Sequence, residues 1–117
     1  MRYMCLIYGQ QGWMKWPDAE KAAAIGAYSR FTDEIKRSGH YVAGDPLEPA
    51  HTARKVHVRN GKVEATDGPF AETKEQLGGY YIIDAQNMDE ASAIAARIPG
   101  ARIGYIEVRA IQALPNV

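Results

Sequence analysis

The sequence predicts an α+β fold of the ferredoxin-like class with an extra β-hairpin. Short apolar segments and two helical patterns follow one another in the order strand, helix, strand, hairpin, strand, helix, strand. Two successive β-α-β units are typical of ferredoxin-like folds. The hairpin is indicated by Asn60-Gly61, because both residues of a tight type I′ turn need positive φ. The 117 residues are expected to form a single domain over residues 1–117.

The first half of the chain is expected to contain a strand, a long helix and a short strand. Residues 2–8 alternate between two apolar faces, which predicts a strand that is covered on both sides. Pro17 suits the first turn of a helix and Gly39 suits its end. The apolar stripe of this helix consists of Ala24, Ile25, Tyr28, Phe31 and Ile35. A strand over residues 41–43 is expected to break into a loop at the glycine and proline of residues 44–46.

The second half is expected to contain the hairpin, a strand, a helix and a final strand. The hairpin strands are predicted over residues 54–59 and 62–66, and their alternation separates an apolar face from a wetter one. The apolar face carries Val56, Val58, Val63 and Ala65, and the wetter face carries His57, Arg59, Lys62 and Glu64.

After the hairpin, a strand over residues 79–84 is again apolar on both faces. Asn87 is expected to cap the second helix, with Glu90 completing a capping box. Pro99-Gly100 ends this helix, and the last strand is expected over residues 103–111. Because two helices cover one face of such a sheet, the apolar residues of the other face are expected to pack against a second copy in a symmetric homodimer.

The charge balance and the cysteine content narrow the choice of partner and compartment. Lysine plus arginine and aspartate plus glutamate each total 14, so neither nucleic acid nor a membrane surface is expected as a partner. The single cysteine, Cys5, cannot form an internal disulfide bond and is expected in the core. Residues 1–9 are too short for a signal peptide or a membrane span, which leaves a cytoplasmic location as the expectation.

Asp67 is the first candidate for a functional residue, because it directly precedes Gly68-Pro69. Proline restricts its own backbone and that of the residue before it, so this corner is stiff. The Asp67 carboxylate is therefore a candidate ligand anchor or general base, or alternatively a turn-former that accepts backbone hydrogen bonds. Glu72 and Lys74 follow the turn and either bind a polar ligand or form a solvated face.

Three histidines occur, and their spacing matches no metal template, so no metal site and no cofactor are expected. They are His40, His51 and His57. His51 is the one that is expected to reach a cleft and bind a ligand, because it lies in the loop beside Pro49.

The segment around Asp67 resembles the DGPF branch of the YCII-related family. The matching residues run from Asp67 through Glu75 (DGPFAETKE) and from Leu77 through Ile83 (LGGYYII). The resemblance implies a dimeric α+β barrel. Other YCII-related proteins are described with a His–Asp pair whose histidine lies on the first helix, and this helix contains no histidine here. Tyr28 is the nearest polar residue at that level, so Tyr28 with Asp67 is the candidate catalytic substitute.

Two functions follow as hypotheses. Relatives by fold include isomerases and dehydrochlorinases of ring compounds, which implies a small polar ligand beside Asp67 and cofactor-free proton transfer. Alternatively, DGPF-type proteins resemble partners of extracytoplasmic-function sigma factors, which implies a non-enzymatic accessory or sensing module.

Overall fold

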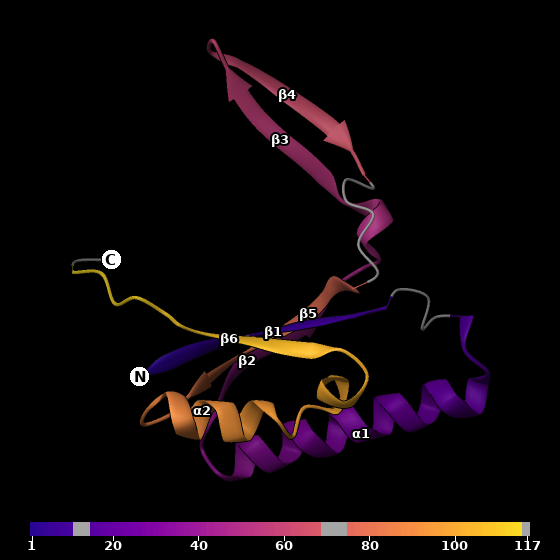
Figure 1. Ribbon diagram of the computed structural model, residues 1–117, viewed down its shortest axis with the longest axis vertical. Coiled ribbons are helices and arrows are strands. Elements are labelled where there is room, and N and C mark those ends of the chain that lie inside the picture. The colour runs from indigo at the N-terminus through magenta and orange to yellow at the C-terminus, as the bar shows by residue number, and fades with distance from the viewer. Residues whose placement is uncertain (11–14, 69–74, 116–117) are drawn as a thin grey trace.

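A computed structural model of the protein describes residues 1–10, 15–68 and 75–115 (Figure 1). A four-stranded antiparallel sheet with the order β2-β5-β1-β6 carries two helices on one face, and a two-stranded hairpin stands apart from it. The elements are β1 (Arg2–Gln10), α1 (Asp18–Arg37), β2 (Tyr41–Pro46), β3 (Arg54–Arg59), β4 (Lys62–Asp67), β5 (Glu75–Asp84), α2 (Met88–Ala95) and β6 (Tyr105–Ala110), with short 3₁₀ helices η2 (Ala50–Thr52) and η3 (Pro99–Arg102). The predicted ferredoxin-like α+β class is confirmed.

The core lies between the sheet and the two helices. The register aligns Tyr3 with Ile83 and Cys5 with Tyr81, so these side chains share the helix-covered face. The buried apolar residues of the described chain are Tyr3, Cys5, Phe31, Ile35, Tyr81, Ile83, Ala85, Ala91, Ile94, Ala95 and Ile98. The hydroxyl groups of Thr32 and Tyr81 share a 2.7 Å hydrogen bond, which satisfies the polar end of a largely apolar side chain.

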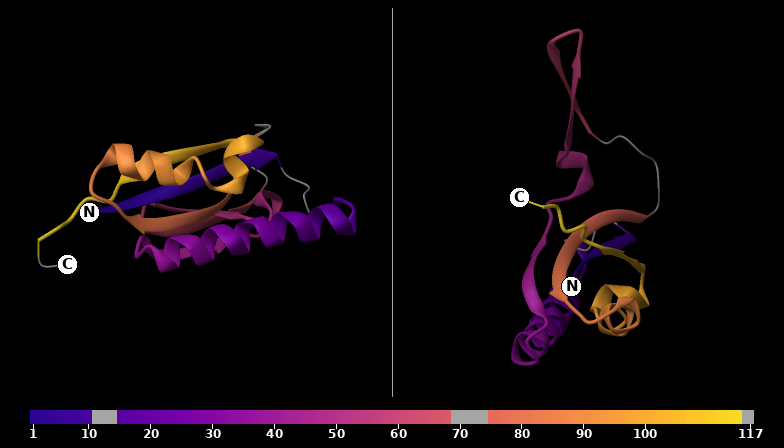
Figure 2. Two further views of the ribbon diagram at one scale, coloured as in Figure 1. Left: turned by 90° about the horizontal axis from the view of Figure 1, so that it is seen from below. Right: turned by 90° about the vertical axis from the view of Figure 1, so that its left-hand side faces the viewer.

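Helix α1 packs through its C-terminal half. Phe31 and Ile35 are buried, whereas Ile25 is 55% exposed although it belongs to the predicted apolar stripe. The first turns of α1 extend beyond the sheet (Figure 2). The prediction of burial at this position was therefore wrong.

The second helix confirms its predicted cap. The Asn87 side chain accepts a hydrogen bond from the Glu90 N–H at 2.9 Å. The Glu90 carboxylate in turn accepts the Gln86 N–H at 3.1 Å, so both oxygen-bearing side chains satisfy backbone donors at the start of the helix. Helix α2 ends at Ala95, and Pro99 then opens η3. The 3₁₀ helix η3 ends at Arg102, before the predicted last strand, and β6 covers Tyr105–Ala110 within the predicted residues 103–111.

Strand β2 continues through residues 44–46, where a loop was expected. Gly44 and Pro46 are tolerated because β2 is an edge strand of the sheet, where one side of the backbone has no ladder partner. Gly44 is also required by packing, because a Cβ atom there would lie 2.6 Å from the Tyr81 ring. The expectation of a loop was wrong because it used local residue preferences without the position of the strand in the sheet.

The hairpin β3–β4 turns at Asn60 and Gly61, which have φ values of 51° and 75° as the sequence predicts. Figures 1 and 2 show that it projects on the side of the sheet opposite the helices. Its valines are exposed: Val56 by 60%, Val58 by 69% and Val63 by 73%. The apolar face of the hairpin, which the sequence predicts to be shielded from water, is therefore exposed in a single chain. The hairpin also extends the molecule, because the radius of gyration is 16.4 Å, against about 13 Å for a compact chain of this length.

Gly104 joins η3 to β6 where the backbone of β1 passes very closely. A Cβ atom at Gly104 would collide with the Tyr8 carbonyl oxygen, whereas one at Gly9 would meet nothing within 4 Å. We expect Gly104→Ala to lower the free energy of unfolding by about 1–3 kcal/mol, because backbone atoms must shift. Urea denaturation measures the loss, and Gly9→Ala is the control that should leave stability nearly unchanged. Equal stability of the two variants would contradict the close approach.

Candidate functional site

Asp67 lies at the end of β4, at the base of the hairpin. The register places it opposite Arg54, whose Nε–H donates a 2.8 Å hydrogen bond to Asp67 Oδ1. The Arg54 side chain is 64% exposed and the Asp67 side chain is 76% exposed. Beside them the Gly68 N–H bonds the Ala53 carbonyl oxygen at 2.7 Å, which ties the two strands together. In a single chain, Asp67 is thus an ion-paired carboxylate on an open surface.

Tyr28 lies on α1 and packs against η3. Burial raises the pKa of its hydroxyl above the ordinary value, and a hydrogen bond with the Gly100 backbone opposes part of that rise. A Cβ atom at Gly100 would lie 2.7 Å from Tyr28 Oη, so the absence of a side chain at Gly100 makes room for this hydroxyl. Helix α1 and the hairpin lie on opposite sides of the sheet (Figures 1 and 2), so one chain does not bring Tyr28 and Asp67 together.

The other predicted ligand-binding residues divide between described and undescribed parts of the chain. His51 lies in η2, the short helix that leads into the hairpin, and its side chain is exposed. Glu72 and Lys74 lie outside the described residues, as do Pro69 and Phe70 of the DGPF segment. The described site at the hairpin base therefore consists of Arg54 and Asp67, with His51 nearby in sequence.

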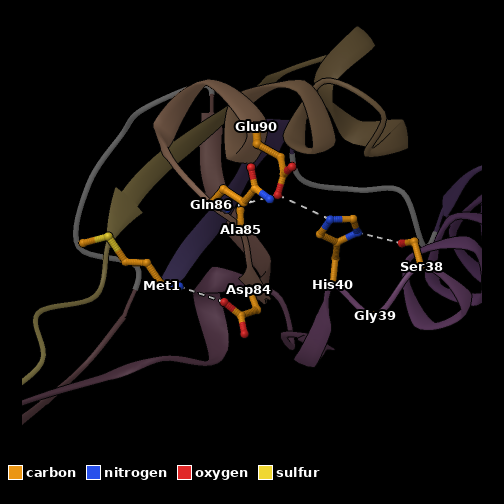
Figure 3. Close-up of a pocket in the computed structure, with 8 residues that line it drawn as sticks. All are labelled: Met1, Ser38, Gly39, His40, Asp84, Ala85, Gln86 and Glu90. Atoms are coloured by element: carbon orange, nitrogen blue, oxygen red, sulfur yellow. Dashed lines mark hydrogen bonds and ion pairs between the residues drawn. The ribbon is translucent and has the colours of Figure 1, made fainter.

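A second polar cluster, which the sequence analysis did not single out, lines a shallow pocket of about 280 Å³ at the opposite end of the sheet. Figure 3 shows it between the end of α1 and the start of α2. His40 Nδ1 lies 2.7 Å from Ser38 Oγ, and His40 Nε2 lies 3.4 Å from Glu90 Oε1. The pocket is completed by Met1, Gly39, Asp84, Ala85 and Gln86.

The order serine, histidine, glutamate has the connectivity of an activated nucleophile. Each member has a structural task, however. Ser38 Oγ donates to the Ile35 carbonyl oxygen at 3.2 Å, at the C-terminal turn of α1 where carbonyls lack helical partners. The Glu90 carboxylate accepts the Gln86 N–H just before the start of α2. His40 thus bridges two helix termini, and we interpret Ser38, His40 and Glu90 as a clamp between them, here called the helix clamp.

Asp84 lies in the same pocket and holds the N-terminal amino group of Met1 at 2.9 Å. This hydrogen bond and the accompanying charge attraction lower the pKa of the Asp84 carboxyl below its ordinary value. The pair joins the end of β5 to the start of β1, and it adds no reactive group to the pocket.

The sheet face opposite the helices, here called the open face, is apolar in the middle and charged near the edges. The register aligns Met4 with Ile82 and Leu6 with Tyr80, and these side chains are half-buried. Tyr80 donates a 2.9 Å hydrogen bond to Asp45, and Tyr8 stacks on Tyr105 with ring centroids 4.9 Å apart. The further members of this face are Ala43, Glu107 and Arg109.

Metal and membrane chemistry receive no support from the described residues. Within residues 1–10, 15–68 and 75–115, no three His, Cys, Asp or Glu side chains lie close enough to hold a metal ion. No helix in the described part of the chain is long and apolar enough to cross a membrane. The expected absence of a metal or other cofactor stays a prediction.

Three comparisons place the chain among known proteins. Residues 1–114 match the YCII-related domain. An uncharacterized protein of Rhizobium meliloti (strain 1021) is 34% identical over 115 residues, covering 93% of this chain and 90% of that protein. A solved structure of 5-chloro-2-hydroxyhydroquinone dehydrochlorinase from Burkholderia phenoliruptrix AC1100, in complex with 2,5-dihydroxybenzoquinone, superimposes with a TM-score of 0.55 at 13% identity. The alignment covers 96% of this chain and 94% of that one. At this identity the likeness shows the fold alone.

The helix clamp predicts an energetic coupling between His40 and Glu90, whose side chains lie 3.4 Å apart. We expect a double-mutant cycle with His40→Ala and Glu90→Gln to give a coupling free energy of about 0.5 kcal/mol. Urea unfolding of the parent, the two single variants and the double variant measures it. A coupling of zero would leave the clamp without support.

Tyr28 predicts a loss of stability in alkaline solution. Its pKa in the folded protein is raised by burial, so the unfolded chain releases the proton more readily. This contribution to stability is fully present below about pH 10 and is lost as the pH rises through the folded pKa. Between pH 9 and 11, the free energy of unfolding should therefore fall less in Tyr28→Phe than in the parent protein. An equal fall in the two proteins would contradict the raised pKa of Tyr28.

Proposed function

The chain belongs to the YCII-related family, and from that premise we propose that it is a cytoplasmic homodimer that binds a small polar molecule beside Asp67. The Arg54–Asp67 pair is the observation that carries the site. It offers a guanidinium and a carboxylate 2.8 Å apart on a hairpin base closed by a backbone hydrogen bond. A rigid scaffold with charged groups at a loop boundary is a common place for ligand binding.

The chemistry of the pair favours a ligand with an acidic oxygen. Guanidinium presents five N–H donors in a planar fork that suits carboxylates and other oxyanions. Arg54 uses its Nε–H on Asp67, so this bond orients the fork. A small carboxylic acid or an acidic hydroxylated ring is the ligand class that this arrangement fits best.

Proton transfer without a cofactor is the reaction that we propose for this ligand class. Loss of hydrogen chloride from a ring compound, the reaction in the name of the structural neighbour, needs a group that accepts a proton and no redox cofactor. Asp67 is the described carboxylate beside the Arg54 fork, so it takes the part of the proton acceptor. Tyr28 lies on the far side of the sheet, and the proposal therefore does not include it in the site.

The homodimer is proposed from the open face. The chain exposes 8534 Å², whereas a folded monomer of this mass exposes about 6300 Å². If the excess of roughly 2200 Å² were buried in each of two subunits, the interface would fall in the range of obligate homodimers, about 2000–5000 Å² in total. Met4, Leu6 and Ile82 form the apolar centre that such an interface requires.

Assignment to the DGPF branch is part of the same proposal, since Asp67 and Gly68 begin the motif, Glu75 ends it, and residues 69–74 between them lie outside the described residues. A role as an accessory to a sigma factor is the competing reading. It predicts co-purification with that partner and no response to small acids.

Disruption of the open face tests the dimer. Leu6→Asp buries a charge in the proposed interface, so we expect light scattering at micromolar concentration to give a monomer mass instead of a dimer mass. Ala43→Asp places the same charge on the edge strand β2 and should act alike with less risk to the fold. Ile25→Asp, on the exposed part of α1, is the matched control and should stay dimeric. A parent protein that is monomeric would refute the dimer.

Ligand binding is tested by thermal shift with a panel of small carboxylic acids and hydroxylated quinones. At a ligand concentration of about 100 times Kd, binding adds about 2.7 kcal/mol to the free energy of unfolding and raises Tm by several degrees. We expect Asp67→Asn to lose this shift while keeping its own Tm. Glu64→Gln is the control, because Glu64 pairs with Arg59 on the same hairpin at 3.7 Å. A shift that survives in Asp67→Asn would place the site elsewhere.

A further inference from the structure

The open face is too small to account for the surface that the subunit leaves exposed. Four strands about 4.8 Å apart and roughly six residues long, at about 3.4 Å per residue, cover roughly 400 Å² in projection. The excess over an ordinary monomer is roughly 2200 Å², several times larger. The hairpin contributes much of the remaining exposed surface, since every residue of β4 and five of the six in β3 are exposed.

The hairpin is not expected to be stable without packing against another surface. A two-stranded hairpin in water is marginally stable and needs packing on one face. Its pairs Val56–Ala65 and Val58–Val63 lie on one face, while His57–Glu64 and Arg59–Lys62 lie on the other. One apolar face and one charged face are typical of an element that is half-buried in an assembly.

The position of the hairpin identifies what covers it. Figure 1 and the right-hand view of Figure 2 show the hairpin rising on the same side of the sheet as the open face. A second copy that sits on the open face therefore lies alongside the hairpin. In a two-fold dimer each subunit gives one hairpin and receives one, so both exposed apolar surfaces are covered by the same contact.

We infer that the β3–β4 hairpin is an arm that packs its valine face against a second copy of this chain and encloses the Arg54–Asp67 pair. The inference rests on the proposed homodimer and its ligand site. Arg54 and Asp67 form the end pair of the β3–β4 ladder, at the base of the arm. Exclusion of water by the second copy strengthens the charge interactions of this pair with a ligand. The site is therefore incomplete in one subunit.

Site-specific photo-crosslinking tests the arm. A benzophenone amino acid replaces Val58 in one experiment and Arg59 in another, because these neighbours point to opposite faces of the hairpin. Two differently tagged copies are mixed, irradiated and separated by mass. We expect several-fold more cross-link between the two tags from position 58 than from position 59.

Light scattering and cross-linking together distinguish failure of the arm from failure of the homodimer. If light scattering gives a dimer and position 58 cross-links no better than position 59, the arm is overturned and the homodimer stands. If the parent protein is a monomer, the homodimer fails and the arm fails with it. Cross-links from position 58 that stay within one chain also overturn the arm.

Enclosure of the pair is tested by thiol reactivity in Asp67→Cys. The natural Cys5 is expected to react little with the reagent, because it is buried and burial raises its pKa to about 11. We expect Ellman's reagent to react with position 67 roughly tenfold more slowly in the dimer than in the same protein carrying Leu6→Asp. Equal rates, with dimer and monomer confirmed by light scattering, would show that the second copy does not enclose this position.

Discussion

The structure depends on one imbalance between the sheet and its helices. In the described residues, α1 and α2 both lie on the same face of the sheet, and that face holds the buried core. The central strands β1 and β5 nevertheless carry apolar side chains on both faces, and Met4, Leu6 and Ile82 are half-buried in the single chain. The hydrophobic effect favours removal of this surface from water in proportion to its area. The proposed second subunit on the open face would remove this surface from water.

The hairpin follows from the same imbalance. A turn as well specified as Asn60-Gly61 sets a firm register, yet it produces a ribbon whose valines face water in the single chain. Its base also holds the Arg54–Asp67 pair. The exposed hairpin and the proposed ligand-binding pair are therefore parts of one element. A partner that covered the hairpin would also change the surroundings of Arg54 and Asp67.

The opposite end of the sheet shows that polar clusters in this fold also serve the scaffold. Ser38, His40 and Glu90 bring together the end of α1 and the start of α2, two places where helical backbone groups lack partners. The arrangement has the outline of a catalytic set, but Ser38 and Glu90 also hydrogen-bond backbone groups at the two helix ends. Asp67 differs because it accepts a hydrogen bond from the side chain of Arg54 on the neighbouring strand and its carboxylate is largely exposed.

The sequence by itself determined the features that depend on neighbours within a few residues. These include the hairpin turn, the Asn87 cap, the end of α1 near Gly39 and the order of elements that defines the fold class. Backbone conformation and capping act over one or two turns of chain, so local residue patterns carry this information.

Only the tertiary structure decided the features that join distant segments. Pro46 is accepted because β2 lies at the sheet edge, and Ile25 is exposed although it belongs to the predicted apolar stripe of α1. Tyr28 and Asp67 lie on opposite sides of the sheet, whereas His40 and Glu90 meet across 50 residues of chain. Local patterns carry no distances between segments, because the packing of the sheet and helices sets those distances.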